Sequence, residues 1–433
     1  MRKPSILLMN RVYPPVRGAT GRLLRDMARY FAREGWNVTI ITTGAKAVNE
    51  RDGSVRVIRV KSPQKPMGLL GYSLAWVKMY MAASRRPAHD LVVTMTDPPL
   101  FSLAGWFLQT TKKSKHVHWL QDVYPDLFPL VGAKFPRFLM RGMETLNRKA
   151  LLASDKVIVI GRCLARRLAY AGIAPKSIAV IPNWPDSELR HDAKHEDDDI
   201  SIGDLEGDIA KDGQLENYRP YHEQIKTGTK FRVLYAGNIG AIHPVGTILD
   251  AARILQDEYP EIEFLFVGDG INYDEIAKAK ASEHLDNVKL LPFQPASRLR
   301  SLMESGDVHL ISLDERAVGM AVPCKLYSAI AARRPCLLVG SDQSEAAKVI
   351  QDYKFGQVVG QGRGQALADM IVGYRSDGQA WFTAHQNAQK AACVFLPEAS
   401  MQAFVNRAYQ VIGRDIPQDT VSSVDANEKI AAE

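Results

Sequence analysis

Residues Gly319–Val339 read GMAVPCKLYSAIAARRPCLLV, and this stretch predicts a loop, a helix and a buried strand in that order. Pro323 suits the first position of the helix, because the N–H group that proline lacks would have no intrahelical partner there. Leu326 and Ile330 lie four residues apart and therefore share one helix face. Pro335 ends the helix, and the CLLV run that follows has the length and apolar character of a buried strand.

Lys325 falls in the first turn of this predicted helix. The free N–H groups and the positive dipole at a helix N-terminus suit a phosphate group. A lysine gains nothing from the same dipole, so an anion bound between the two would account for its position. An exposed lysine on an ordinary crossover helix of an α/β protein accounts for it equally well. The stretch alone leaves both interpretations open.

Length and composition indicate a globular protein with two domains. A chain of 433 residues is long for one hydrophobic core, and its 46% hydrophobic and 24% charged residues are ordinary for a folded protein. No run of about 18 uncharged apolar residues is present. The four cysteines are scattered without metal-binding spacing, which is typical of the reducing cytosol. We expect a cytoplasmic enzyme without a metal site or cofactor.

The charge of the chain is divided unequally between its two halves. Residues 1–190 hold 31 Lys and Arg against 12 Asp and Glu, whereas the remainder holds 24 against 36. A strongly basic half indicates a polyanionic partner. The sequence contains no nucleic-acid-binding motif, so we expect an anionic membrane surface and no nucleic acid.

The basic half alternates strands and helices, as a doubly wound parallel sheet does. Gly18 and Gly21 lie in the loop after the first strand, where the backbone passes close to a ligand or simply turns. The loop lacks the GxGxxG pattern, which argues against a nicotinamide cofactor. The predicted strands are Ser5–Asn10, Asn37–Thr43, Val55–Lys61, Asp90–Thr96, Lys115–Gln121, Lys156–Gly161 and Ser177–Asn183.

The acidic half repeats the alternation after a polar segment, residues 187–229, that has the composition of a linker. Asp197, Asp198 and Asp199 in this segment form a solvated charge run more plausibly than a metal site. Glycines after the first two strands would let the backbone approach a diphosphate, although turn geometry would also explain each one. The predicted strands are Phe231–Ala236, Glu263–Gly268, Val288–Phe293, Val308–Leu313 and Cys336–Gly340.

Five motifs, in this order, resemble those of retaining glycosyltransferases of family 4: WLQDVYPD (Trp119–Asp126), IPNWPD (Ile181–Asp186), YAGNIG (Tyr235–Gly240), FVGDG (Phe266–Gly270) and the VPCKLY helix itself. The likeness is strongest to bacterial enzymes that build surface polysaccharides on a lipid carrier. It implies the GT-B fold, in which two Rossmann-like domains face each other across a cleft.

The resemblance also implies a role for each part of the chain. Residues 1–186 would form the acceptor domain and residues 230–396 the donor domain, which binds a nucleotide-sugar. Residues 397–413 would be a helix that packs back on the first domain, and residues 414–433 a disordered tail. No bound metal is implied.

Each candidate site residue takes its role from the same resemblance. Asp122 would face the acceptor hydroxyl, although it could instead cap the next helix. Many family members have histidine just before this aspartate, where this chain has Gln121. The other acceptor-side candidates are Gly18, Gly21, Asp97 and His118, of which His118 fits a core histidine better than a site residue. The donor-side candidates are Gly237, Asn238, Gly240, Gly268, Asp269, Gly270, Phe293, Pro323, Lys325 and Ser328.

The chain also departs from the family pattern. Two glutamates that usually grip the donor correspond here to Met320 and Ser328, and the usual basic residues after the GNIG segment are replaced by Ala241–Pro244. We therefore expect transfer of a sugar from a nucleotide-sugar to a polyprenyl-diphosphate-linked saccharide on the inner membrane face. A sugar-nucleotide epimerase and a degenerate partner subunit remain alternatives.

One predicted helix of the basic half suits a membrane interface. Residues 67–84 place Leu70, Leu74, Val77 and Met81 on one apolar stripe, with Lys78 as the single charged residue. A core helix that packs on the first sheet would show the same pattern.

Overall fold

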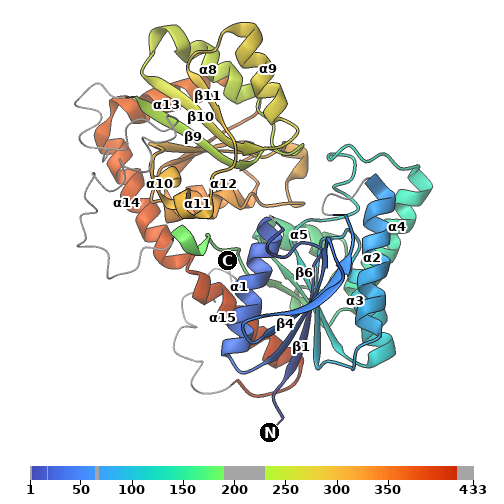
Figure 1. The fold of residues 1–433 in the computed structure, drawn as a ribbon. Helices are drawn as coiled ribbons and strands as arrows, with labels where there is room; N and C mark the ends of the chain where they lie inside the picture. Colours follow the sequence, from blue (N-terminus) through green and yellow to red (C-terminus); the bar gives the residue numbers. More distant parts are fainter. Residues whose placement is uncertain (1, 17, 64–67, 190–229, 417–433) are drawn as a thin grey trace. The chain divides into compact units, whose positions relative to one another are not determined.

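The computed structural model describes residues 2–16, 18–63, 68–189 and 230–416, which divide into two compact units (Figure 1). The first unit comprises Met1–Trp184, Ala317–Val322 and Val394–Glu433, and the second comprises Pro185–Arg316 and Pro323–Cys393. The aspartate run at residues 197–199, most of the predicted linker and almost all of the predicted tail lie outside the described residues.

The first unit is built on an eight-stranded sheet with the strand order β3-β4-β2-β1-β5-β6-β7-β8. All neighbouring strands are parallel except β3, which pairs antiparallel with β4. The strands are β1 (Ser5–Met9), β2 (Asn37–Gly44), β3 (Val48–Asp52), β4 (Val55–Lys61), β5 (Leu91–Met95), β6 (Lys115–Leu120), β7 (Lys156–Val159) and β8 (Ile178–Val180).

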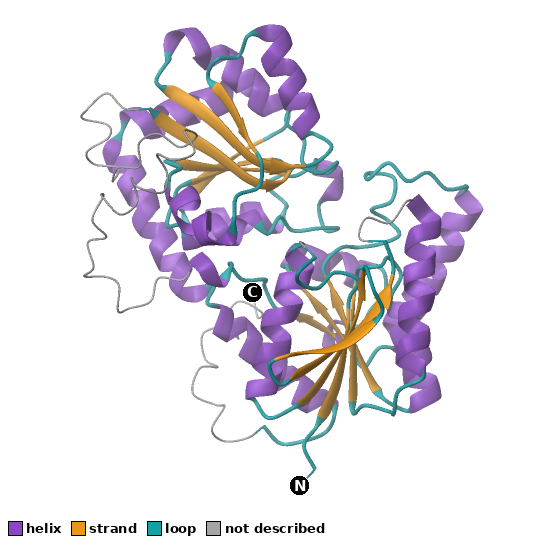
Figure 2. Cartoon of the chain, in the orientation of Figure 1, coloured by secondary structure: helices purple, strands orange, loops and turns teal. Residues whose placement is uncertain are grey.

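Helices cover both faces of this sheet, which explains why its central strands are apolar throughout rather than alternating (Figure 2). Ile6 and Leu8 face the core shared with α1 and α15, whereas Leu7 and Met9 face the core under α2 and α3. The helices are α1 (Ala19–Arg33), α2 (Gly68–Ser84), α3 (Ser102–Lys112), α4 (Arg137–Ala153), α5 (Arg162–Tyr170) and α15 (Pro397–Val411).

The last helix of the described chain completes the core of the first unit. In α15, the ring of Phe404 lies 6.0 Å from Phe31 and 5.0 Å from Trp119, in edge-to-face contacts. Tyr409 makes a similar contact with Trp36 at 5.0 Å. Aromatic pairs of this kind stabilise a core beyond the area that they bury.

The second unit is a six-stranded, fully parallel sheet with the strand order β11-β10-β9-β12-β13-β14. This is the doubly wound order of dinucleotide-binding folds. The strands are β9 (Phe231–Asn238), β10 (Ile262–Asp269), β11 (Val288–Leu291), β12 (Val308–Ser312), β13 (Cys336–Val339) and β14 (Gly356–Val359).

Seven α-helices in the described residues of the second unit surround its sheet. Phe264 and Val233 face the core beneath α8 and α13, whereas Leu234 and Leu265 face the core beneath α10 and the end of α11. The helices are α8 (Gly246–Glu258), α9 (Tyr273–Glu283), α10 (Leu299–Glu304), α11 (Lys325–Ala331), α12 (Glu345–Tyr353), α13 (Gly364–Ser376) and α14 (Gly378–Val394). Short 3-10 helices occupy Pro175–Ser177, Ser187–Leu189, Ala296–Arg298 and Glu315–Ala317.

The unit boundaries differ from the predicted domains at one internal segment. Ala317–Val322 groups with the first unit, although the prediction placed it inside the donor domain. There, the Met320 carbonyl accepts a hydrogen bond from the N–H of Val123 at 2.8 Å, and Val322 joins the apolar cluster around Leu164. Within the described ranges, no helix is both long and apolar enough to cross a bilayer.

Candidate active site

In each unit, several candidate residues lie just beyond the carboxyl ends of the strands, where open parallel sheets bind their ligands. The strand order of the second unit reverses between β9 and β12, and these two strands pair only through Val308 with Val233 and His309 with Leu234. Beyond that point the strands separate. Their carboxyl ends therefore leave room for side chains from the segments that follow them.

Lys325 reaches this point from the start of α11. Its Nζ donates a hydrogen bond to the Asn238 carbonyl oxygen at 2.8 Å and lies 5.2 Å from the centre of the Tyr235 ring. Burial lowers the pKa of Lys325 to about 8, because a charged ammonium loses hydration there. The helix begins at Lys325 itself, so the expectation that Pro323 occupies its first position is wrong.

His243 belongs to the loop that replaces the basic residues of the family pattern. Its Nδ1 lies 2.6 Å from the Ser312 carbonyl oxygen, and burial lowers its pKa to about 3 with a further contribution from Lys325. The Asn272 amide fixes the same loop by donating to the carbonyl oxygens of Gly240 and His243. Because its low pKa keeps His243 neutral at pH 7, Lys325 and not His243 carries the positive charge beside the end of β9.

The glycines of the donor-side motifs allow the ends of β9 and β10 to approach each other. A Cβ atom on Gly268 would lie 2.1 Å from the Gly237 carbonyl oxygen, and one on Gly270 would lie 2.5 Å from the Ile239 carbonyl oxygen. Both glycines have φ angles in the region that disfavours side chains, +149° and +135°. Backbone packing between neighbouring strands therefore requires these two glycines.

The structure brings most, but not all, of the donor-side candidates together. Gly237, Asn238, Gly240 and Gly268–Gly270 lie with Lys325 at the ends of β9 and β10, and Asp269 is exposed there. Phe293 follows the next strand, β11, and is 42% exposed. Pro323 is buried ahead of α11, and Ser328 is partly buried one turn into that helix.

The first unit presents a polar cluster at the carboxyl ends of β1, β5 and β6. Arg11 follows β1, and its Nε donates to Oδ1 of Asp97, which follows β5, at 2.7 Å. The backbone N–H of Arg11 also donates to the Asp97 carbonyl oxygen at 2.7 Å. The guanidinium carbon of Arg11 lies 5.1 Å from the centre of the Tyr72 ring on α2.

Asp122 lies beside this cluster at the end of β6. Burial raises the pKa of its carboxyl to about 7, and the negative charge of Asp97 adds to the shift. Its backbone N–H lies 3.3 Å from the Thr96 hydroxyl oxygen, and no described group donates to its carboxylate. The side chain therefore does not act as a helix cap, and a carboxyl group with this pKa can exchange a proton near neutral pH.

Three other acceptor-side candidates have structural explanations. A Cβ atom on Gly18 or Gly21 would lie 2.9 or 2.8 Å from Cγ1 of Val12, so these glycines make room for Val12. His118 is 3% exposed inside β6, and its Nδ1 lies 2.9 Å from the Thr94 hydroxyl. His118 is therefore a core histidine, and its prediction as an acceptor-side residue is wrong.

Gln121, which replaces the histidine of other family members, is held by the IPNWPD motif. Its side-chain amide and that of Asn183 donate to each other, at 3.2 and 2.7 Å. The next residue, Trp184, donates from its indole to Asp26 at 3.2 Å, and its carbonyl oxygen accepts from Arg22 at 2.9 Å. Neither Gln121 nor Asn183 is exposed to a substrate.

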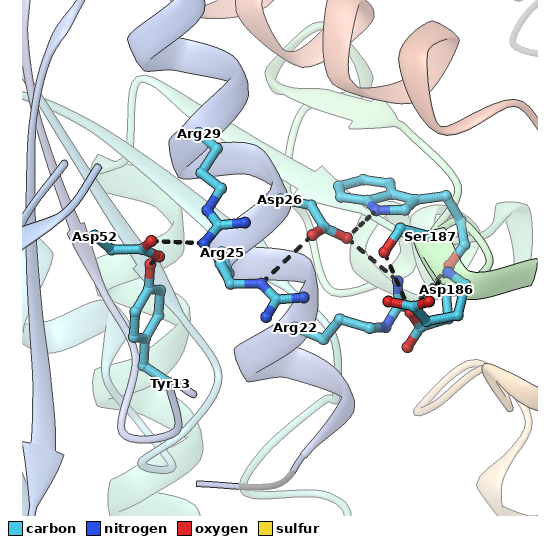
Figure 3. Close-up of polar contacts among 10 residues, drawn as sticks. Tyr13, Arg22, Arg25, Asp26, Arg29, Asp52, Asp186 and Ser187 are labelled. Carbon is cyan, nitrogen blue, oxygen red and sulfur yellow. Dashed lines mark hydrogen bonds and ion pairs between the residues drawn. The ribbon is translucent and has the colours of Figure 1, made fainter. Parts of the chain in front are cut away.

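Three arginines of α1, Arg22, Arg25 and Arg29, contact carboxylates of the same unit (Figure 3). Arg29 donates to Asp52 of β3 at 2.6 Å, and Tyr13 donates to the other oxygen of the same carboxylate at 2.6 Å. Arg22 lies 3.4 Å from Asp26. These contacts fasten α1 to the hairpin of β3 and β4 and to Trp184.

Sequence reasoning missed Arg11, Tyr72 and Tyr124 in the first-unit cluster. Burial and the charges of Asp122 and Asp97 raise the pKa of Tyr124, so its phenol stays protonated at neutral pH. Arg11 and Asp97 each lie two residues beyond the end of a strand, and this shared position could have identified Arg11 from the sequence. Nothing in the sequence indicated that Tyr72 of α2 would reach them.

Two known domain families match the chain. "Glycosyl transferase 4-like domain" matches residues 18–184, and "Glycosyl transferases group 1" matches residues 230–377. The chain therefore contains two glycosyltransferase domains. Two curated relatives are the "Probable glycosyltransferase WbjE" of Pseudomonas aeruginosa, 24% identical over 67% of each chain, and the "Putative colanic acid biosynthesis glycosyl transferase WcaI" of Escherichia coli (strain K12). The latter is 23% identical over 81% of this glycosyltransferase and 86% of the relative.

Solved structures agree with the fold of this glycosyltransferase. Sucrose-phosphate synthase from Thermosynechococcus elongatus superimposes with a TM-score of 0.73 at 15% identity, over 95% of this chain and 100% of that one. The Anabaena protein HepE in complex with UDP-glucose superimposes with a TM-score of 0.67 at 16% identity, over 94% and 99%. The glycosyltransferase has the GT-B fold.

Proposed function

We propose that this glycosyltransferase moves a sugar, with retention of configuration, from a nucleotide-sugar to a polyprenyl-diphosphate-linked saccharide. The observation that carries the proposal is Lys325, a partly buried cation held at the strand-order reversal of a doubly wound sheet. A fixed cation of this kind stabilises the charge that develops on a departing diphosphate. HepE in complex with UDP-glucose supports a nucleotide-sugar donor, and WcaI, named for colanic acid biosynthesis, supports a bacterial polysaccharide as the product.

Asp122 is the residue that we assign to the acceptor. In the reaction, the acceptor hydroxyl oxygen bonds to the anomeric carbon while the bond from that carbon to the diphosphate oxygen breaks. The hydroxyl proton leaves, and the nucleoside diphosphate departs with the electron pair of the broken bond. A carboxylate whose pKa is near 7 is suited to take up that proton. We further propose that the reaction needs no metal ion and takes place at the cytoplasmic face of the membrane.

Incubation of the pure protein with a panel of nucleotide-sugars tests the donor half of the proposal. The correct donor at about 100 times its Kd should stabilise the fold by about 2.7 kcal/mol, which a thermal-shift assay detects. Addition of lipid-linked acceptors should then give a glycosylated lipid and free nucleoside diphosphate, also in EDTA.

Other outcomes of the same assay favour the alternatives. Conversion of the donor to an isomeric nucleotide-sugar without an acceptor would indicate an epimerase. Donor binding without any turnover on a broad acceptor panel would indicate a degenerate partner subunit. The absence of binding for every nucleotide-sugar would contradict the role of Lys325.

A further inference from the structure

Three neighbouring helices of the first unit expose an unusual amount of apolar surface. Of the sixteen exposed large apolar side chains in the described residues, eleven lie between Leu69 and Leu152. They belong mainly to α2, α3 and α4, which pack side by side in the order α2, α3, α4 (Figure 1). Monomeric soluble proteins rarely expose a large contiguous apolar patch unless the patch binds something.

Helix α2 is apolar on both its inner and its outer face. Ala75, Met79 and Ala83 are buried against the sheet. The opposite stripe contains Leu70, which is 84% exposed, and Leu74, which is 49% exposed. The apolar stripe seen in the sequence is therefore mainly the solvent-facing side of the helix and not its core side.

The exposed apolar surface continues onto the other two helices. In α4, Phe138 is 78% exposed. In α3, Phe107 is 41% exposed, and its ring lies 6.4 Å from Trp76 and 5.9 Å from Tyr80 of α2. We call the surface formed by the exposed side chains of α2, α3 and α4 the apolar face.

The charges on these helices identify the kind of partner. The three helices carry six basic residues, Lys78, Lys112, Arg137, Arg141, Arg148 and Lys149, against the single carboxylate of Glu144. Exposed apolar side chains that share their helices with an excess of cations match a bilayer with anionic headgroups. A second copy of the same face would place these cations against one another, which opposes a symmetric dimer.

Two contacts connect the apolar face with the cluster around Asp122. Tyr72 of α2 lies under the Arg11 guanidinium, and the Asn147 amide of α4 donates to the Tyr124 carbonyl oxygen at 2.7 Å. The helices that would touch lipid are thus fixed to the edge of the sheet that we assign to the acceptor.

We propose that the apolar face inserts into the headgroup region of an anionic phospholipid bilayer, with its basic residues at the level of the lipid phosphates. The proposal rests on the proposed function insofar as the acceptor is lipid-linked, and it names the surface and the mode of contact. Insertion of α2 and α4, rather than the charge of the basic half alone, supplies the attachment.

Vesicle co-sedimentation of the full chain tests this inference. The triple variant Leu70→Ser/Leu74→Ser/Phe138→Ser removes three exposed side chains and should leave the fold and the nucleotide-induced thermal shift unchanged. Its partitioning into vesicles that contain phosphatidylglycerol should fall by about tenfold or more, since burial of even one such side chain is worth about that factor. The control Tyr170→Ser/Ile271→Ser removes two exposed side chains outside the apolar face, 86% and 69% exposed, and should bind like the wild type.

A charge variant separates the two contributions. Arg137→Gln/Arg141→Gln/Lys149→Gln should weaken binding in low salt and have less effect in high salt, where the wild type retains the apolar contribution. Phosphatidylcholine vesicles should bind the wild type more weakly than anionic ones.

Several results would overturn the inference. One is recovery of the triple variant with the vesicles as fully as the wild type, and another is a loss of binding in the control as large as that in the triple variant. If the wild type binds its nucleotide-sugar but no vesicle, the apolar face does not insert into a bilayer, whereas the proposed sugar transfer is not contradicted. A concentration-dependent dimer that the triple variant loses, without vesicle binding, would assign the face to a second copy.

Discussion

Lys325 Nζ donates its hydrogen bond to the Asn238 carbonyl oxygen, so a cation from the start of α11 is held against the last residue of β9. Neither segment places this charge alone. The helix supplies the ammonium, and the strand end supplies the acceptor that fixes its position.

Replacement of Lys325 with alanine should weaken nucleotide binding and turnover together. A charge-assisted contact is worth about 1.5–3 kcal/mol, which corresponds to a loss of roughly ten- to more than a hundredfold. Calorimetric titration with nucleoside diphosphate measures the effect, and Lys278→Ala on the exposed side of α9 is the matched control. Unchanged affinity in Lys325→Ala would exclude the diphosphate role. In the wild type, affinity should also decline as the pH rises through about 8, because the free ammonium then loses its proton.

Replacement of Asp122 with asparagine should lower kcat by about 10²–10⁴ and leave donor affinity unchanged. The wild-type kcat/KM should rise with pH through about 7, since the carboxyl is protonated and inactive as a base below its pKa. In Asp97→Asn, this rise of kcat/KM should occur at lower pH. The substitution removes the negative charge that raises the pKa of Asp122, and it frees Arg11 from its ion pair with Asp97. A rise at the same pH as in the wild type would show that a group other than Asp122 controls the pH profile.

Acid should destabilise the first unit through two core histidines. The Thr94 hydroxyl lies 2.9 Å from both His116 Nε2 and His118 Nδ1, and burial lowers the pKa of both rings to about 3. Unfolded histidine has a pKa of about 6.5, so below that pH the unfolded state binds more protons than the native state. Stability is therefore present above about pH 6.5 and is lost as the pH falls.

Each of these histidines contributes up to about 1.4 kcal/mol per pH unit over that range. His118→Gln should consequently flatten the dependence of the unfolding temperature on pH between 6.5 and 4, even if it lowers stability at pH 7. Comparison with the wild type cancels the opposite contribution of Asp122, whose raised pKa favours the native state as the pH falls from about 7. An unchanged slope would mean that the rings already bind protons in the folded protein.

Replacement of Gly268 with alanine should destabilise the second unit by about 2–5 kcal/mol, since the new Cβ would overlap the Gly237 carbonyl oxygen at an unfavourable φ. The control Gly373→Ala lies on α13, where no atom would lie within 4 Å of the new Cβ. It should stabilise the protein by about 0.5–1 kcal/mol. Equal unfolding temperatures for the two variants would refute the packing argument.

Most strands of the parallel sheets could be predicted from the sequence, because they are buried on both faces and therefore consist of apolar runs. The prediction missed β3, whose sequence VNERD is polar and largely exposed, and β14, whose GQVV contains only two apolar residues. That Lys325 lies in the first turn of a helix was predictable from the VPCKLY segment, and its role in donor binding stays a prediction. The position of Tyr72 was not predictable, since its contact with Arg11 depends on how α2 is seated on the sheet, and His118 was misplaced because a strand pattern does not distinguish a core ring from a site ring.

The return of α15 to the first unit has a consequence for synthesis of the protein on the ribosome. Phe404 and Tyr409 cover Phe31, Trp36 and Trp119, yet they are translated after every residue of the second unit. The first domain therefore keeps these aromatic side chains uncovered until α15 has been translated. By that time every residue of the second domain has been made. A premature stop codon just before α15 would leave the second domain intact and would expose the aromatic core of the first domain.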